Sequence, residues 1–170
     1  TNSATLVITN IPSSWYGYGY RCQLQNGSYD QTTRLKFTAT WLGTTSSVWE
    51  DPANWSCGTI PTASTAVTIS SGNNPNVGNG KTIVANGINI AAGKTINVNG
   101  GNLRIRGSIS GSGTINNTSG EVEFFGTTNQ TIPAGLFVSN TAAKVRINNT
   151  GTVTLSGPLK VTSQLTCDDG

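Results

Sequence analysis

The sequence predicts an all-β protein: a three-sided, right-handed parallel β-solenoid with coils of about 20 residues, preceded by antiparallel strands. Two observations of composition support this. Val and Ile recur at short intervals between Gly, Asn, Thr and Ser, and the 170 residues include 21 glycines. Only 10% of the residues are charged, without charge blocks or proline runs. This composition is typical of many short strands joined by tight turns.

The third observation is a repeat after Thr62. Three interleaved apolar series recur with steps of about 20 residues, and all three lengthen together between Val122 and Val145. A single insertion of about three residues near 126–135 explains this, whereas a sandwich would not show it. The series are Ile83, Leu103, Val122, Val145 and Leu165; Val67, Ile88, Ile109, Ile132 and Val153; and Val77, Ile96, Ile115, Val138 and Leu159.

The first forty residues read as antiparallel strands with one apolar face. Apolar residues alternate with polar ones at 6–8, 18–22 and 35–39, and Asn26-Gly27 is a strong turn signal. The pattern Leu6-x-Ile8-x-Asn10 followed by Tyr20-x-Cys22 resembles strands E and F of an immunoglobulin-like domain, with 33–40 as strand G. The first strands of that fold and the partner cysteine of Cys22 are missing. Either the segment is the end of such a domain, or its strands pair elsewhere.

The segment 40–70 resembles a tryptophan-rich module of large secreted surface proteins of the Bacteroidetes. In those proteins the module leads into a Gly/Asn/Thr-rich β-solenoid and often follows immunoglobulin-like repeats. The resemblance implies an extracellular, multi-domain, adhesin-like protein exported by the type IX system, whose C-terminal sorting domain is not seen in this sequence. The matching residues are Trp41, Gly43, Trp49, Pro52, Asn54, Trp55, Ser56, Gly58, Pro61 and Thr62.

Elementary physics gives this segment a structural role. The end of a solenoid exposes apolar interior and unpaired strand edges, so it needs a cap. Large tryptophans can cover the interior, and prolines stop strands from continuing. We therefore predict a cap built from Trp41, Trp49, Pro52, Trp55 and Pro61. The predicted parts are 1–40, the end of an immunoglobulin-like domain; 41–62, the junction and cap; and 63–170, a solenoid open at its C-terminal end.

Charged residues in the solenoid fall into two predicted ladders. Alignment of 103–105, 122–124 and 145–147 puts Arg104, Glu123 and Arg146 in one outward column, and Asn102, Glu121 and Lys144 in the next. Opposite charges then alternate between neighbouring coils, which stabilises the pairing and opposes a slipped register. The same alignment puts Cys167 in an inward column, as a buried, unpaired thiol.

Several function classes have little support. The sequence has no histidine, so it lacks the commonest general base and metal ligand. Basic residues are scattered, which argues against nucleic-acid binding, and no apolar run is long enough for a membrane span. Glu121 and Glu123 have glycosidase-like spacing, but flanking cations would lower their pKa values, whereas a general acid needs a raised one. We expect no enzyme activity and no cofactor, and we expect Asp168 and Asp169 to form a solvated turn.

Three functional hypotheses follow, and the first is preferred: a non-enzymatic structural or adhesive segment that forms a rigid stalk or assembles through open β edges. Its partners would be further domains of the same polypeptide or other copies. The second is a carbohydrate-binding module that stacks sugars on aromatic residues, and the third is an excised polysaccharide-processing enzyme. Whether Cys22 and Cys57 form a disulfide is left open. The candidate sugar-stacking residues are Trp15, Tyr16, Tyr18 and Tyr29.

Overall fold

The computed structural model describes residues 19–20, 26–27, 33–34 and 38–168. The chain divides into two compact units, 1–37 and 38–170. In the first unit, β1 (Gly19–Tyr20) pairs antiparallel with β2 (Thr33–Arg34), with Tyr20 opposite Thr33. Gly27 between them has a φ of 80°, which suits a turn. The antiparallel pairing predicted here is therefore confirmed for these residues.

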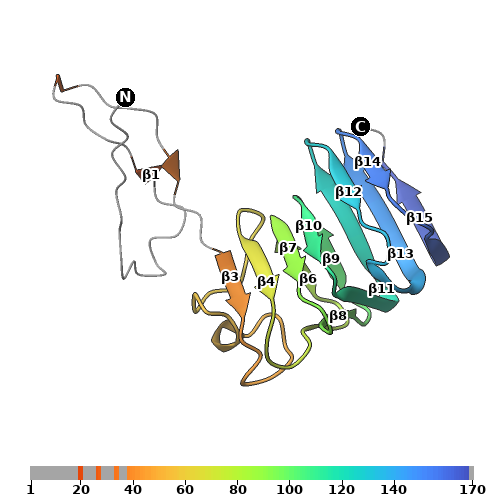
Figure 1. Ribbon diagram of the computed structural model, residues 1–170, viewed down its shortest axis with the longest axis horizontal. Coiled ribbons are helices and arrows are strands. Elements are labelled where there is room, and N and C mark those ends of the chain that lie inside the picture. The colour runs from red at the N-terminus through yellow and green to blue at the C-terminus, as the bar shows by residue number, and fades with distance from the viewer. Residues whose placement is uncertain (1–18, 21–25, 28–32, 35–37, 169–170) are drawn as a thin grey trace. The chain divides into compact units, whose positions relative to one another are not determined.

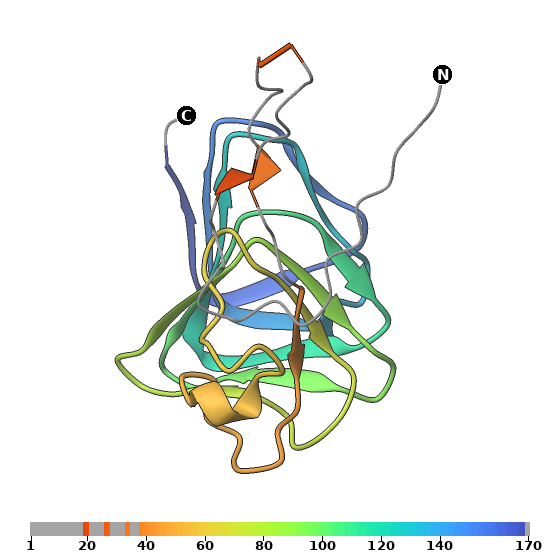
Figure 2. The ribbon, with the colours of Figure 1, turned by 90° about the vertical axis from the view of Figure 1, so that its left-hand side faces the viewer.

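The second unit is a parallel β-solenoid of about five coils. Its strands follow one another in chain order from β3 to β15 (Figure 1), and successive coils surround a common interior (Figure 2). The strands are β3 (Thr38–Trp41), β4 (Ala66–Ile69), β5 (Asn76–Val77), β6 (Thr82–Ala85), β7 (Gly87–Ile90), β8 (Thr95–Val98), β9 (Asn102–Ile105), β10 (Ile109–Gly111), β11 (Thr114–Gly126), β12 (Gln130–Ile132), β13 (Phe137–Asn149), β14 (Val153–Leu155) and β15 (Lys160–Cys167).

The coils have the three predicted faces. The first face holds β3, β4, β7 and β10 in one parallel sheet, and β12 and β14 in another. The second holds β5, β8 and the first parts of β11, β13 and β15; the third holds β6, β9 and the last parts of the same three long strands. The long strands therefore turn a corner without breaking, at irregular positions in their pairing.

The third face has the predicted register at every step. Leu103 lies between Ile83 and Val122 on neighbouring coils, and Val145 lies between Val122 and Leu165. Successive inward side chains therefore stack on one another, and all but Leu165 are buried. This continuous apolar column is what holds the coils in line, since burying each such side chain stabilises the fold by about 1.5–3 kcal/mol.

The predicted register of the other two faces is wrong at three steps. Val77 pairs with Val98 rather than Ile96, and Ile132 pairs with Leu155 rather than Val153. These errors are shifts of two residues, because every second residue of a strand faces inward and either apolar neighbour fits the pattern. Ile115 pairs with Phe137 rather than Val138, just before a bend where Ser139 and Asn140 have positive φ.

The insertion also lies later than predicted. Gln130 and Ile132 already stand 23 residues before their partners Val153 and Leu155, so the extra residues follow β12. They lie in 133–141, which contains the bend at Ser139 and Asn140, rather than near 126–135. The notable difference in the N-terminal half is β3, which pairs in parallel with β4. Residues 38–40 therefore belong to the solenoid sheet, and the boundary falls after residue 37.

Two corner glycines allow neighbouring coils to approach closely. A Cβ atom on Gly101 would lie 2.4 Å from the carbonyl oxygen of Gly78, and one on Gly120 would lie 2.4 Å from that of Gly101. Real Cβ atoms do not come so close to backbone oxygen. Glycine is therefore required at this corner, where the second face turns into the third.

Candidate functional site: the closed and open ends of the solenoid

The N-terminal end of the solenoid core is closed by three tryptophans. Trp41, Trp49 and Trp55 are all buried. Trp49 and Trp55 meet edge to face with ring centroids 4.6 Å apart, and Trp41 lies 5.1 Å from Trp55 and 6.2 Å from Trp49. Aromatic pairs in such geometry contribute about 0.5–1.5 kcal/mol beyond the area they bury.

The indole N–H groups show how tightly this cluster is built into the loops around it. Trp41 Nε1 donates to the Asn73 carbonyl at 2.6 Å, and Trp55 Nε1 donates to the Trp49 carbonyl at 2.7 Å. Trp49 Nε1 is buried without a hydrogen-bond partner. Two of the three tryptophans are therefore fixed in orientation by hydrogen bonds, and the third by packing alone.

The two predicted cap prolines have different surroundings. Pro52 is exposed and begins a short 3₁₀ helix, η2 (Pro52–Asn54), where its missing N–H costs nothing. Asp51 caps this helix by accepting from the Ala53 N–H at 3.0 Å, and the neighbouring Glu50 is half-buried rather than on the surface. Pro61 is buried, just before the first full coil begins. Both prolines thus lie in the cap, but only Pro61 lies in its packed interior.

Asn54 is the residue that organises the cap loop, and sequence reasoning did not single it out. Its buried side chain accepts from the backbone N–H groups of Thr45 and Ser46. It also donates to Ser46 Oγ at 2.8 Å and to the Val48 carbonyl at 3.0 Å. A sequence signal existed, since Asn54 precedes Trp55 within the tryptophan-rich segment, but its composition alone reads as an ordinary turn.

Cys57 lies beside the cap as a half-buried, free thiol. Its sulfur is 3.3 Å from the carbonyl oxygen of Thr59, to which it donates a weak hydrogen bond. The candidate disulfide partner, Cys22, lies outside the described residues. So do the four candidate sugar-stacking residues, Trp15, Tyr16, Tyr18 and Tyr29, and the proposed use of these aromatic rings stays a prediction.

The charged ladders have the predicted register. Glu123 lies between Arg104 and Arg146 on neighbouring coils, and Glu121 lies between Asn102 and Lys144. Arg104 binds Glu123 in a two-pronged ion pair, with distances of 2.6 and 3.0 Å, and its guanidinium also lies 4.5 Å from the centre of the Phe125 ring. Such two-pronged pairs are stronger than ordinary surface ion pairs.

Not every predicted charge pair forms. Arg146 turns away from Glu123 and binds Asp168 at 2.7 and 3.1 Å, so Asp168 is an ion-pair partner rather than the predicted solvated turn. Glu121 accepts from Asn102 at 3.3 Å, and the ion pairs between described residues are those of Arg104 and Arg146. The predicted Glu121–Lys144 pair is therefore absent from this part of the chain, although the two residues are neighbours in the sheet.

The surroundings of Glu123 lower the pKa of its carboxyl group. Burial raises the pKa, but hydrogen bonds from Arg104 and Asn148 and the positive charges of Arg104 and Arg146 outweigh burial. The carboxylate thus stays ionised well below neutral pH. A general acid of a glycosidase needs a raised pKa instead, so the pair of carboxylates has the electrostatics of a structural ladder.

A second set of buried polar groups, also unanticipated, holds the first face near β12. Gln130 donates to the carbonyls of Ile105 and Gly107 at 3.0 Å each. Asn149 donates to Gln130 Oε1 at 2.6 Å. These side chains replace the missing strand pairing between β10 and β12, because buried backbone carbonyls need hydrogen-bond partners. The amide residues looked like turn residues in the sequence.

The far end of the solenoid core is open. Leu155 and Leu165 on the coil of β14 and β15 are 48% and 59% exposed. A shallow cavity of about 220 Å³ lies there, with an almost wholly apolar lining that includes Val145, Ile147 and Val161. Cys167 takes its predicted place opposite Ile147, but it is exposed. The prediction of a buried thiol was wrong because no further described coil covers this side.

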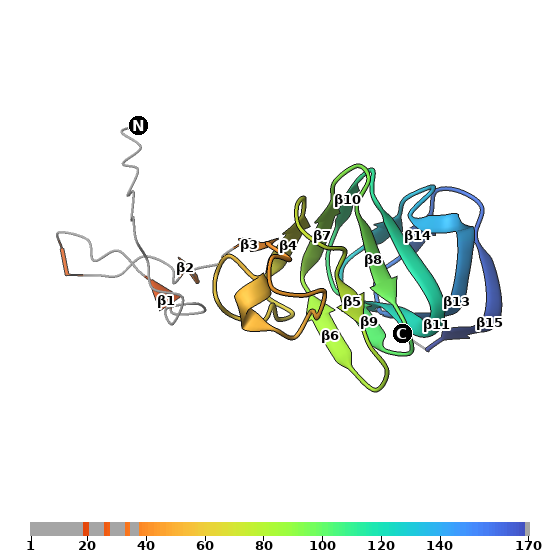
Figure 3. The ribbon, with the colours of Figure 1, turned by 90° about the horizontal axis from the view of Figure 1, so that it is seen from below.

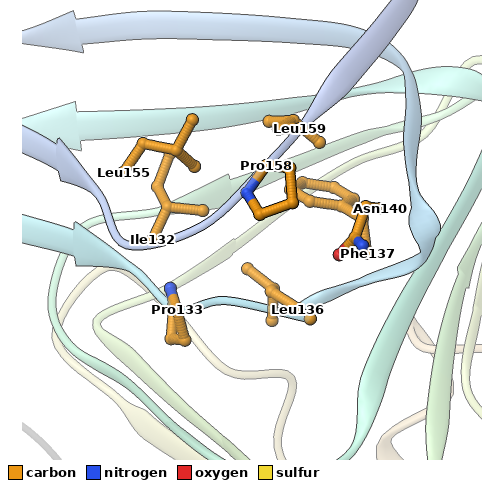
Figure 4. Close-up of a pocket in the computed structure, with 9 residues that line it drawn as sticks. Ile132, Pro133, Leu136, Phe137, Asn140, Leu155, Pro158 and Leu159 are labelled. Atoms are coloured by element: carbon orange, nitrogen blue, oxygen red, sulfur yellow. The ribbon is translucent and has the colours of Figure 1, made fainter.

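The last corner of the first face is apolar as well. Leu136 and Phe137 gather there with Pro158 and Leu159 of the following coil (Figure 4). Leu159 packs against the main core. The coil of β14 and β15 is therefore joined to the body of the solenoid through this corner as well as through its strands, and it presents a defined surface rather than a loose end.

The fold and these sites define 38–168 as a parallel β-solenoid with one closed and one open end. Comparison with protein-family models, with curated proteins and with solved structures gave no match. Among the described residues, no helix has the length and apolar character needed to cross a membrane. In the same part of the chain, no group of three or more acidic or cysteine residues is placed to hold a metal ion.

Proposed function

We propose that this chain is a non-enzymatic, extracellular structural or adhesive segment that forms a rigid stalk or a self-assembling surface element. The observation that carries the proposal is the combination of a continuous apolar core, a tryptophan plug at one end and an exposed apolar coil at the other. Such a module serves to extend an assembly, because its open side needs another surface on which to stack.

The electrostatics support a structural role. The ion pairs of Arg104 with Glu123 and of Arg146 with Asp168 run between neighbouring coils, where they hold coils in register. The lowered pKa of Glu123 opposes general acid catalysis. The extracellular location and export by the type IX system are supported by the resemblance of the 40–70 segment to surface proteins of the Bacteroidetes.

Limited proteolysis and a glycan array together test this function. A rigid stalk should leave a resistant fragment that begins near residue 38 after digestion, since in-register parallel sheets expose few flexible sites. The same protein should show no specific binding on the array. Specific glycan binding that is lost in Tyr16→Ala or Tyr18→Ala would overturn the purely structural function and favour a carbohydrate-binding module.

A further inference from the structure

The coil of β14 and β15 presents two unpaired strand edges on one side. Among the described strands, β15 pairs with β13 and β14 pairs with β12. The N–H of Asp168 donates to Ile147 and that of Ser156 donates to Ile132, so these residues point back toward the preceding coil. Since neighbouring residues of a strand point in opposite directions, Leu155, Leu165 and Cys167 present their backbone groups at the open edge.

We propose that a second copy of this chain covers this open side, with the two copies related by a two-fold axis. The inference rests on the proposed structural function and names the partner of the open side. Such a partner must supply both apolar side chains and unpaired backbone groups. A second copy supplies these from the same Leu155, Leu165 and Val161 that need covering.

The charges of β15 favour a second copy in antiparallel orientation. Lys160 begins the strand and Asp168 follows its last residue. In an antiparallel pair with its axis near Ser163 and Gln164, Lys160 of one copy lies close to the partner's Asp168, and the reverse pair forms as well. Opposite charges across such a pair stabilise it, and like charges would oppose a parallel arrangement with Lys160 beside Lys160.

The length of the coil allows one axis to serve both open strands. Thr154 is the centre of β14, and 163–164 lies nine to ten residues further along the chain, which is about half of a 20-residue coil. A two-fold axis that passes through Thr154 and through the corner near 163–164 therefore pairs β14 with β14 and β15 with β15 at the same time. Both pairings then place apolar residues inward.

The closed end explains why the assembly should stop at two copies. The other end of the described core is covered by Trp41, Trp49 and Trp55, so it offers no matching apolar surface for a head-to-tail chain. An interface that uses the same surface on both copies closes upon itself. Because one coil end is smaller than the roughly 800 Å² per partner of a standard interface, we expect a dissociation constant of roughly micromolar order.

Sedimentation of the full chain over a concentration series tests the proposal. We expect a monomer–dimer equilibrium, no larger species, and a dissociation constant raised at least about tenfold by Leu165→Lys. Val138→Lys is the matched control, since Val138 is a 40% exposed apolar residue away from the open side, and it should leave the equilibrium unchanged. A monomer at every concentration, or a dimer that Leu165→Lys does not weaken, would overturn the proposal.

Single cysteines test the arrangement of the two copies. In a background with Cys22, Cys57 and Cys167 changed to Ser, Gln164→Cys lies beside the axis and should form a disulfide between copies on oxidation. Thr166→Cys should not, because its two copies lie roughly 15 Å apart at about 3.3 Å per residue, beyond disulfide reach. Cross-linking through Thr166→Cys and not through Gln164→Cys would refute the two-fold arrangement. Resistance to proteolysis is independent of both results, so the stalk function can stand if this proposal fails.

Discussion

Asn54 shows how a single polar side chain can organise the closed end of the solenoid. It satisfies two backbone N–H groups and one carbonyl of the surrounding loop while fully buried. A buried amide of this kind is stabilising only when its hydrogen bonds are made, because an unsatisfied buried polar group costs about 1–3 kcal/mol. The neighbouring tryptophans can therefore pack over the core without leaving the loop backbone unpaired.

The two tryptophans of the cap should respond differently to the same change. In Trp55→Phe, loss of the indole N–H leaves the Trp49 carbonyl without its 2.7 Å donor, so we expect a loss of about 1–3 kcal/mol of unfolding free energy. In Trp49→Phe, the N–H that is removed is buried and unpaired, so the loss should be clearly smaller. Urea unfolding of the two variants compares them directly, and an equal loss in both would contradict this account of the cap.

Glu123 should make stability depend on pH. Its pKa in the folded protein is lowered, so its ion pair stabilises the fold fully above the ordinary glutamate pKa of about 4.3. This contribution is lost as the pH falls through the lowered, folded-state pKa. Glu123→Gln should therefore lower the unfolding free energy by about 1–3 kcal/mol at pH 7, and the difference from the natural protein should shrink in acid.

Glu121→Gln is the matched control for this pH dependence. Glu121 accepts one hydrogen bond of 3.3 Å from Asn102, so its loss should matter less at neutral pH. Urea unfolding of the three proteins at several pH values provides the comparison. A gap between Glu123→Gln and the natural protein that widens toward low pH would contradict the direction of the pKa shift.

At the scale of the strands, the inward columns and the outward columns have opposite tolerance. Ile105 is fully buried between Ala85 and Phe124 on neighbouring coils. Asn116 faces outward and makes a single 3.3 Å hydrogen bond to Asn97. Ile105→Asp should unfold the chain at 25 °C, because burying an unpaired carboxylate costs more than a marginally stable protein can tolerate.

The matched change, Asn116→Asp, should cost at most about 0.5 kcal/mol, as is usual for surface positions. Circular dichroism and urea unfolding measure both variants. Equal tolerance of the two changes would contradict the register of the third face and of the second face beside it.

The sequence predicted the strands best where one apolar column continues through many coils. The third face was predicted correctly at all four steps because Ile83, Leu103, Val122, Val145 and Leu165 have no competing apolar neighbour at a similar spacing. The first and second faces contain apolar residues two positions apart, and a period of two cannot distinguish them. The bend at Ser139 and Asn140 could not be predicted either, since asparagine and serine are common in every turn here.

The candidate sites were predicted in part for the same reason. Tryptophan is rare and large, so the cap was visible in composition, and alternating charges at a fixed period revealed the ladders. The choice of Arg146 between Glu123 and Asp168 depends on side-chain reach, which a register cannot supply. The network of Asn54, and that of Gln130 and Asn149, depends on which amides the fold buries, and a chain rich in asparagine gives no signal for that.

At the scale of the whole solenoid unit, the two ends have different chemistry. One end is sealed by three buried tryptophans, and at the other β15 lies at the outer side of the stack, beside β13 (Figure 3). The ladders between the ends are short-range and repeat from coil to coil, so each coil is stabilised mainly by its neighbours. Loss of order should therefore begin at the open coil, where neighbours are present on one side only.

The parallel stacking of coils is the central claim, and one disulfide measures it directly. Thr95 and Thr114 are partners on neighbouring coils, and their hydroxyl oxygens lie 3.0 Å apart. In a background with Cys22, Cys57 and Cys167 changed to Ser, Thr95→Cys with Thr114→Cys should form an intramolecular disulfide, because aligned strands are about 4.8 Å apart. Thr95→Cys with Thr118→Cys should not, and mass spectrometry after oxidation reads out both. Failure of the first pair to close, or equal closure of both pairs, would contradict the solenoid.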